Sequence, residues 1–221
     1  MENTPPNNEG SSSVKSNSTG PEQSPQLDWD LNDPDRFAKS ILRYSNYLRL
    51  LAEVQLGQYM RSRLGASDVV QETFLEATRD WQSFRGKSDV ELLAWLKKIL
   101  FHNVNQAIDF HMAKKRSIRK EVSMERMVAM HFSSLAIENA LVGHVSSPSE
   151  PARKREMMVA VADCMAMLSD EYRQILVLRT LQSKSYQEIA PILGKSVEAC
   201  RMSWVRAVKE LRQHFVAKDL I

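Results

Sequence analysis

The chain has 221 residues, which is enough for one domain or two small ones. Its net charge is only +3, so any nucleic-acid surface must come from local basic patches rather than from a global basic field. Its two cysteines, Cys164 and Cys200, are far apart and its five histidines are scattered, which excludes a disulfide framework and predicts no metal site or other cofactor. No apolar run approaches the roughly 18 residues of a membrane span, and the N-terminus lacks a signal-peptide core, so we expect a cytoplasmic protein without a membrane association.

Changes of composition divide the chain into four parts. Residues 1–34 are rich in Ser, Asn, Pro and Gly and are predicted to be a disordered N-terminal tail. Segments of helical period fill residues 35–120 and return in residues 156–221. Between them, residues 121–155 have the turn chemistry of a linker. The sequence therefore predicts an all-α protein with two small helical domains joined by a flexible linker.

The first module opens with an amphipathic helix. Ser67 is positioned to cap it, and Asp68 and Glu72 are near its start, where acidic side chains favour the helix dipole. Spacings of four, three and four residues predict a core-facing stripe of Val70, Phe74, Ala77 and Trp81. Other faces are left for Asp68, Gln71, Glu72 and Arg79.

A second helix is predicted from about Val90 to Met112, after a break that begins at Gly86. Its apolar stripe is Leu92, Leu93, Leu96, Ile99, Leu100, Val104, Ala107 and Ile108. Trp95 lies beside this stripe among polar residues, and the helix leads into a basic cluster of Lys114, Lys115 and Arg116. Aromatic rings stack on bases while cations follow phosphates, so this pattern suits single-stranded or melting DNA. The alternative is that Trp95 edges the core and the cations favour the helix C-terminus.

The region from Leu168 to Leu211 has the pattern of a helix-turn-helix. Ser185 and Glu188 form a capping box, Gly194 tolerates the positive φ of a helix stop, and Ser196 offers a second N-cap. The helix that follows has an apolar stripe of Val197, Cys200, Trp204, Ala207, Val208 and Leu211. Its opposite face carries Glu198, Ala199, Met202, Arg206 and Lys209. Such a helix suits a DNA major groove, and the alternative is a solvated helical hairpin.

Four short runs carry a family resemblance. Ser67 to Leu75 reads S-D-V-V-Q-E-T-F-L, and Ala94-Trp-Leu96 is followed by Ile99 and Asn103. Further on come L-S-D-E-Y-R-Q-I-L from Leu168 and S-Y-Q-E-I-A from Ser185, with Leu193-Gly194 at the turn. The first two runs are similar to the D-L-V-Q-E-T-F-L and A-W-L-x-x-I-A-x-N motifs of region 2 in sigma-70 family sigma factors of RNA polymerase, and the last two resemble region 4. The resemblance is closest to the small extracytoplasmic-function (ECF) members.

This resemblance implies a region 2 helical bundle, a region 4 helix-turn-helix and a role in transcription initiation. It implies binding to core RNA polymerase, at the clamp helices of the β′ subunit and at the β flap, and recognition of the −10 and −35 elements of promoter DNA. Many small sigma factors are held inactive by an anti-sigma protein, although no residue identifies one here. The docking residues implied for the polymerase are Asp68, Gln71 and Glu72.

The resemblance also implies two sets of DNA contacts. Those for the −10 element are Trp95, Asn103, Asn105, His111, Lys114, Lys115 and Arg116. Those for the −35 element are Ser196, Glu198, Ala199, Arg201, Met202, Arg206 and Lys209. Within the second set, Arg201 and Lys209 are expected on phosphates, which supply affinity rather than sequence choice.

The spacing of the modules is compatible with this role. Promoter elements about 25 base pairs apart are separated by roughly 85 Å. A connector of about 35 residues extends to roughly 115 Å at its limit, so the two modules can reach both elements.

Some positions depart from the family pattern. Pro191 falls inside the first helix of the helix-turn-helix, where it removes a bond to the Gln187 carbonyl and is expected to cost on the order of 3 kcal/mol or to kink the helix. Met202 and Ser203 replace small polar and basic residues, which predicts an unusual promoter sequence.

Two other classes of protein fit the sequence less well. A polymerase-independent helix-turn-helix regulator with a sensing or dimerising N-terminal module accounts for residues 185–211 but not for the run from Ser67 to Leu75. An enzyme would need a nucleophile with its base, a metal cluster or a phosphate-binding glycine loop, and the sequence supplies none of these. We therefore predict a protein without catalytic activity.

Overall fold

The computed structural model describes Met1 and residues 33–61, 65–112 and 151–220, and every regular element within these ranges is a helix. The all-α prediction is confirmed. Nearly all of the predicted N-terminal tail and most of the predicted linker lie outside the described residues.

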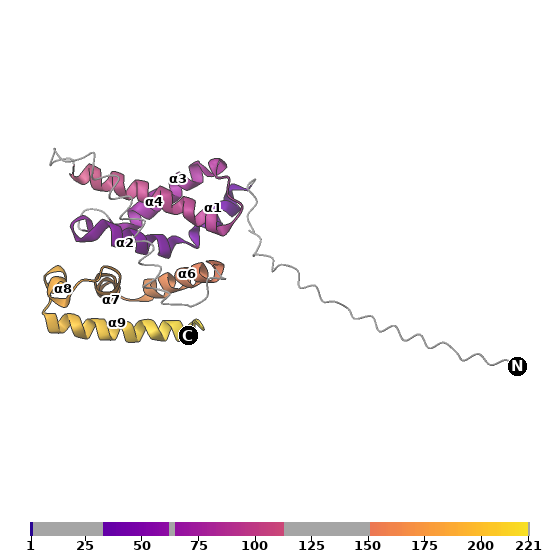
Figure 1. Cartoon of the computed structure of the whole chain (residues 1–221). Coiled ribbons are helices and arrows are strands. Elements are labelled where there is room, and N and C mark those ends of the chain that lie inside the picture. Colours follow the sequence, from indigo (N-terminus) through magenta and orange to yellow (C-terminus); the bar gives the residue numbers. More distant parts are fainter. Residues whose placement is uncertain (2–32, 62–64, 113–150, 221) are drawn as a thin grey trace.

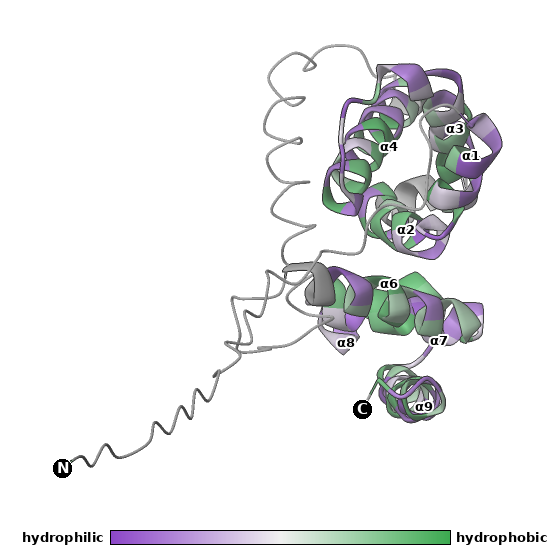
Figure 2. Ribbon diagram, turned by 90° about the vertical axis from the view of Figure 1, so that its right-hand side faces the viewer, coloured by the Kyte–Doolittle hydropathy of each residue, from purple (hydrophilic) through white to green (hydrophobic). Residues whose placement is uncertain are grey.

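The N-terminal lobe contains α1 (Pro34–Leu42), α2 (Ser45–Arg61), α3 (Ala66–Arg79), the 3-10 helix η1 (Trp81–Ser83) and α4 (Asp89–Met112) (Figure 1). Both α2 and α4 pack against α3, and α1 lies against α3 as well. Hydrophobic residues of these helices face one another in the side view (Figure 2). The largest fully buried side chains of this lobe are Tyr47, Phe37, Ile41, Leu48, Leu51, Leu92, Leu96 and Leu100.

The C-terminal lobe contains α6 (Pro151–Met167), α7 (Asp170–Leu176), the π-helical turn η2 (Val177–Leu181), α8 (Tyr186–Leu193) and α9 (Val197–Ala217). Its first helix begins at Pro151, ahead of the boundary predicted at residue 156. Proline suits the first turn of a helix because its missing N–H would have no partner there. Part of the stretch predicted as linker is therefore helical.

The two lobes are packed against each other. In Figure 1, α6, α7 and α8 lie in a row between α2 above and α9 below. Contacts join α2 to α6 and to η2, and the buried residues of both lobes form one continuous hydrophobic cluster. As a result, α9 lies on the side of the C-terminal lobe that faces away from the N-terminal lobe (Figure 1).

The helix starts of the helix-turn-helix are those that the sequence predicts. Ser185 Oγ accepts from the Glu188 N–H at 3.3 Å, and Glu188 Oε2 accepts from the Ser185 N–H at 2.7 Å. Gly194 ends α8 with φ +63°, and Ser196 Oγ accepts from the Ala199 N–H at 3.1 Å. The turn between α8 and α9 is thus fixed by local hydrogen bonds on both sides.

The start of α3 differs from the prediction. The helix begins at Ala66 with Gly65 at the N-cap, so Ser67 is inside the first turn and does not cap it. Instead, Asp68 Oδ2 accepts from the Gly65 N–H at 3.1 Å. The predicted core-facing stripe is confirmed, since Val70 and Ala77 are buried and Phe74 and Trp81 pack partly against the core, but the buried side of α3 is wider and also includes Val69 and Thr73. Thr73 is tolerated there because its hydroxyl donates to the Val69 carbonyl at 2.8 Å.

Pro191 is accommodated inside α8. The helix continues to Leu193, and the Pro191 ring is exposed. Because the break in the backbone ladder faces solvent, water can satisfy the Gln187 carbonyl that loses its N–H partner.

The left-handed turn at Gly194 gives a stability test. A Cβ at this position would meet nothing within 4 Å, so Gly194→Ala changes only the backbone strain. We expect it to lower the free energy of unfolding by about 1 kcal/mol, because alanine disfavours this φ, and we expect Gly194→Asn to cost less. Urea denaturation of the three proteins measures both changes. An asparagine variant as unstable as the alanine variant would contradict this account.

Candidate nucleic-acid interface

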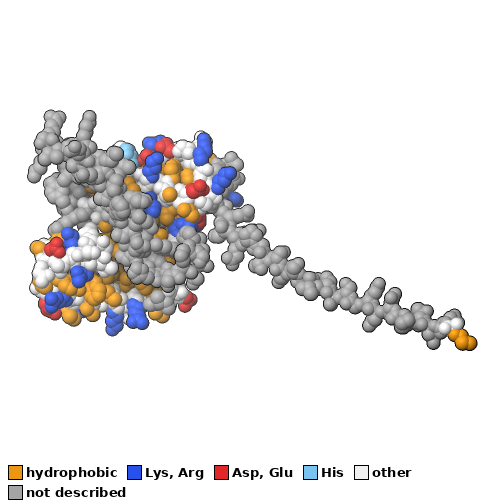
Figure 3. Space-filling model, viewed as in Figure 1, with side chains coloured by type: hydrophobic (Ala, Val, Ile, Leu, Met, Phe, Trp, Pro, Cys, Tyr) orange, Lys and Arg blue, Asp and Glu red, His pale blue; other side chains and the backbone are white. Residues whose placement is uncertain are grey.

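One side of α9 packs against the other helices of the C-terminal lobe, and the opposite side is exposed. Cys200, Ser203 and Ala207 are the buried residues, and Trp204 and Leu211 pack partly against the core. Exposed residues on the opposite side are Glu198, Met202, Val205, Arg206 and Lys209. Lys and Arg side chains project along the lower edge of the molecule, where α9 runs (Figure 3). The helix thus offers a long, free face with cationic and apolar groups, as a major-groove helix requires.

The predicted apolar stripe of α9 is wrong at one position. Val208 is 38 % exposed, while Ser203, which the pattern left out, is 7 % exposed. Burial of Ser203 is possible because its hydroxyl donates to Glu171 Oε1 at 2.7 Å. Ser203 can therefore face inward because its hydroxyl has an acceptor on another helix.

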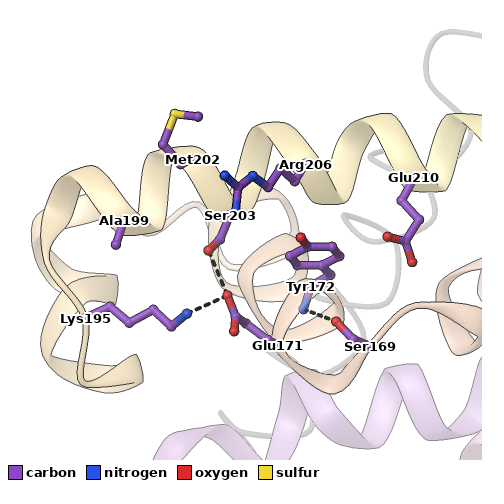
Figure 4. Close-up of a pocket in the computed structure, with 9 residues that line it drawn as sticks. All are labelled: Ser169, Glu171, Tyr172, Lys195, Ala199, Met202, Ser203, Arg206 and Glu210. Atoms are coloured by element: carbon purple, nitrogen blue, oxygen red, sulfur yellow. Dashed lines mark hydrogen bonds and ion pairs between the residues drawn. The ribbon is translucent and has the colours of Figure 1, made fainter.

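Glu171, in the first turn of α7, contacts both the turn and the second helix of the helix-turn-helix (Figure 4). The carboxylate oxygen that accepts from Ser203 also lies 2.6 Å from Lys195 Nζ, in the turn before α9. Hydrogen bonds from Lys195 and Ser203 lower the pKa of Glu171 below its ordinary value. The interaction restricts both the position of α9 along its axis and its rotation about that axis, and the rotation determines which of its side chains are exposed.

An open groove of about 680 Å³ lies beside this contact, between the start of α7 and α9. Ala199, Met202 and Arg206 line it from α9. Figure 4 shows the Met202 side chain pointing away from α7. These residues thus occupy the border between the free face of α9 and α7.

Ser196 and Arg201, two further residues of the predicted −35 set, already have partners. Ser196 Oγ accepts the Ala199 N–H, which leaves its own O–H free to donate. Arg201 lies 3.6 Å from Glu198 and places its guanidinium 5.8 Å from the centre of the Tyr186 ring. Arg179 lies over the same ring at 4.9 Å, so two cations gather beside the start of α8. This arrangement is suited to a phosphate backbone.

The placement of Trp95 matches one of the two alternatives that the sequence left open. Its ring is half-buried and packs against Phe37 and Phe84, with centroids 6.2 and 5.3 Å apart. In this alternative Trp95 lies at the border of the core, because α1 and the segment before α4 cover that side of α4. One part of the Trp95 ring is consequently taken up by packing within the lobe.

Asn103 is also inside the N-terminal lobe. It is 8 % exposed and its amide lies 3.4 Å from Thr73 Oγ1, so it bridges α4 and α3. Asn105 is half-buried, and its Oδ1 has no hydrogen-bond partner among the described residues. The backbone of His111 belongs to α4 but its side chain is not described, and Lys114, Lys115 and Arg116 lie outside the described residues.

The exposed side of α4 has a different composition from the predicted one. Residues four apart form an exposed row of Ala94, Lys98, His102, Gln106 and Phe110. Phe110 is 78 % exposed, and the Gln106 amide lies 2.7 Å from His102 Nε2. Spacing by four from Ala94 could have revealed this row, since Ala94 begins the A-W-L run.

The exposed side of α3 does hold the three residues predicted to dock. Asp68, Gln71 and Glu72 are all exposed, and Leu75, one turn further along, is 67 % exposed. Asp68 has a second role because its carboxylate satisfies the Gly65 N–H. Leu75 was missed because apolar residues were assigned to the core, yet its position four residues after Gln71 puts it on this face.

The site thus defines a two-lobed helical protein with an exposed helix-turn-helix on one lobe. The family model for Sigma-70 region 2 matches residues 43–117, and that for Sigma-70, region 4 matches residues 158–211. The chain belongs to the sigma-70 family of RNA polymerase sigma factors, in the ECF group. Its function is that of a sigma factor, which binds core polymerase and promoter DNA for promoter-specific transcription initiation.

Several relatives agree with this assignment. The chain is 29 % identical over 175 residues to the ECF RNA polymerase sigma-E factor of Escherichia coli (strain K12), covering 79 % of this chain and 84 % of that protein. The same figures apply to the ECF RNA polymerase sigma-E factor of Salmonella typhimurium (strain LT2). RNA polymerase sigma factor YlaC of Bacillus subtilis is 27 % identical over 150 residues, which are 67 % of this chain and 76 % of that protein.

Two further observations concern the described residues alone. None of their helices is long and apolar enough to cross a membrane. No group of three or more His, Cys, Asp or Glu side chains among them is arranged to hold a metal ion, and Cys164 and Cys200 are both buried as free thiols.

The lowered pKa of Glu171 predicts a pH-dependent stability. Its charged form is favoured in the folded protein, so its stabilising contribution is present above the ordinary pKa of 4.5 and is lost as the pH falls through the lowered folded value. We expect Glu171→Gln to lower the free energy of unfolding at pH 7 and to have a smaller effect below pH 4.5. Urea denaturation at several pH values measures this difference. A difference that stays constant down to the acid limit would refute the coupling.

Proposed function

We propose that this sigma factor divides its contacts among three helices: α9 reads the −35 element, α4 binds the −10 element and the free face of α3 docks on the clamp helices of the polymerase β′ subunit. The observation that carries the proposal is that α9 is locked on one side by Cys200, Ser203 and Ala207 and is bare on the other. A helix held in this way can enter a major groove without rearranging its own lobe.

Within α9, base reading and phosphate binding fall to different side chains. The residues proposed to face the bases are Glu198, Ala199, Met202 and Arg206. Lys209, Arg201 and Ser196 are proposed to contact phosphates, which fix position without reading sequence. Because Met202 is apolar and 45 % exposed, we propose that it contacts a thymine methyl group.

For the −10 element, we propose that the row on α4 faces the DNA strand. Lys98 supplies a cation, and Phe110 supplies an exposed ring on which a base can stack. The remaining predicted contacts are Asn105, His111, Lys114, Lys115 and Arg116. Trp95 and Asn103 are proposed to hold α4 in place from within the lobe, as their packing favours.

For polymerase docking, we propose that Gln71, Glu72 and Leu75 form the centre of the α3 face. An acidic and amide surface with one apolar side chain suits a basic partner helix pair. The C-terminal lobe is proposed to bind the β flap, which the family resemblance supports. An anti-sigma protein is a further proposed partner on the same basis. The chain would act in the cytoplasm with the polymerase, and this role requires no catalytic group of its own.

The docking proposal predicts an effect at Gln71. Gln71→Arg places a cation in the centre of the face, and we expect roughly tenfold weaker binding to core polymerase, or about 1.4 kcal/mol. The matched control is Gln82→Arg, the same substitution at another exposed position of this lobe. Fluorescence anisotropy with labelled protein measures both affinities. Asp68 is avoided, since its substitution would also remove the α3 cap.

The same measurement also distinguishes a sigma factor that docks through α3 from a polymerase-independent regulator. Equal affinities of the two variants would argue against docking through α3. A chain that binds duplex DNA tightly but does not bind core polymerase would favour a polymerase-independent regulator.

The reading of the −35 element predicts two distinct effects. Lys209→Ala should weaken binding of the holoenzyme to every promoter alike and reduce the salt dependence by about one counterion. Met202→Ala should instead change the preference at one or two base pairs, because it removes a base contact. Binding to a library of −35 sequences at two salt concentrations measures both, with Gln213→Ala as the control on the same helix. A uniform loss for Met202→Ala would remove it from the base-reading set.

A further inference from the structure

A cavity of about 330 Å³ lies between the two lobes, along the first half of α6. The N-terminal lobe lines it with Arg43 and Tyr44, which join α1 to α2, and with Val90 at the start of α4. From α6 come Arg155 and Val159, among others. The volume is that of roughly ten water molecules and falls in the size range of small-molecule sites. None of the residues assigned to DNA or to polymerase lines this cavity.

The acidic side chains of the cavity have partners already. Asp89, at the start of α4, is paired with Arg43. Asp163 on α6 accepts from the Asn46 amide at 2.8 Å and lies 3.9 Å from Lys218 Nζ. Glu156 is exposed, so its carboxylate is surrounded by solvent. The carboxylates of the cavity therefore do not call for a cationic ligand.

The Tyr44 hydroxyl, in contrast, is a buried donor without an acceptor. Tyr44 is 3 % exposed, and its hydroxyl oxygen accepts from Arg43 Nη2 at 2.8 Å. Its own O–H donates to none of the described residues. Burial raises the pKa of Tyr44 above its ordinary value, although the neighbouring Arg43 acts to lower it, so the hydroxyl keeps its proton at neutral pH. A buried donor of this kind is costly unless a molecule from outside the chain accepts from it.

Arg155 supplies a second donor on the opposite wall. Its side chain is half-buried, and among the described residues no hydrogen bond or ion pair holds the guanidinium. Arg155 is close enough to Tyr44 for its charge to act on the Tyr44 pKa. A guanidinium presents its N–H groups as a planar fork that matches the two oxygens of a carboxylate. The two unmatched donors of the cavity thus both suit one anionic acceptor.

Apolar surface lies next to these donors. Val159 follows Arg155 by four residues and is therefore on the same face of α6. Val90 lines the cavity from the other lobe and is 50 % exposed, as an apolar residue at the mouth of a binding site would be. A ligand whose charged group reaches Arg155 can bury an apolar body between these two valines.

We propose that this cavity binds a small monocarboxylate, whose carboxylate accepts from Arg155 and from the Tyr44 hydroxyl and whose apolar body lies between Val90 and Val159. Each lobe supplies one donor and one apolar contact, so the bound acid stabilises the folded chain by mass action. The proposal does not rest on the assignment of the DNA and polymerase contacts, because it uses other residues.

The test uses phenylpropionate as the probe and the full chain as the protein. Its matched analogue is phenylpropylamine, which has the same apolar body and the opposite charge. Titration followed by amide chemical shifts in NMR gives the affinity and the location together. We expect phenylpropionate to bind with a Kd of about 1 mM or lower, the scale for a probe of this size, and to shift the amides of Val90 and Val159. The amine should leave both amides unchanged.

Two variants identify the donors. Arg155→Gln keeps a good helix former but removes the charge, and we expect at least tenfold weaker binding of phenylpropionate. The control is Arg212→Gln, the same substitution at an exposed position of α9, which should bind as the parent does. Tyr44→Phe keeps the ring and removes the O–H, and we expect about fivefold weaker binding. Its control is Tyr172→Phe at another half-buried position.

Thermal unfolding gives a second readout. Phenylpropionate at ten times its Kd should raise the Tm of the parent by about 3 °C and leave the Tm of Arg155→Gln nearly unchanged. Circular dichroism establishes that each variant is folded, and Arg155→Gln alone decides the case if Tyr44→Phe is not. Three results would overturn the proposal: no shift of the Val90 and Val159 amides, equal binding of the amine, or full affinity in folded Arg155→Gln.

Discussion

The packing of the two lobes depends on the contacts that the buried guanidinium of Arg173 makes. It belongs to α7, yet it contacts the Leu168 carbonyl at the end of α6, Asp170 in its own helix and Glu53 in the other lobe. A cation that is 8 % exposed can be stable only with several acceptors, and these acceptors come from separate segments. Its burial therefore specifies the angle between α6 and α7 and the position of α2 beside them.

Another residue of the same helix, Glu171, extends this constraint to α9. Glu171 is two residues from Arg173 and faces the other way, toward Ser203 and Lys195. One short helix thus contacts α2 on one side and α9 on the other. A shift of α7 would therefore change both the packing of the two lobes and the orientation of α9.

The sequence was sufficient for features determined by neighbours along the chain. The Ser185 capping box, the left-handed Gly194 and the Ser196 cap involve residues within a few positions of one another, and all three are present. The α3 start was misplaced because Gly65 and Ser67 are both acceptable N-caps and only the structure selects one. The sequence left two alternatives open for Trp95 and misassigned Ser203, because the surroundings of both residues come from distant segments, Phe37 in one case and Glu171 in the other. The contact of the lobes has no sequence signature, since Asn46 and Asp163 are ordinary polar residues until α2 and α6 meet.

The continuous hydrophobic cluster has a consequence for how the molecule loses its structure. Two bundles with separate interiors melt independently, whereas bundles that share an interior behave as one cooperative unit. While α2 and α6 remain together, loss of either bundle exposes apolar surface of the other, so heat or denaturant should disrupt both in one transition.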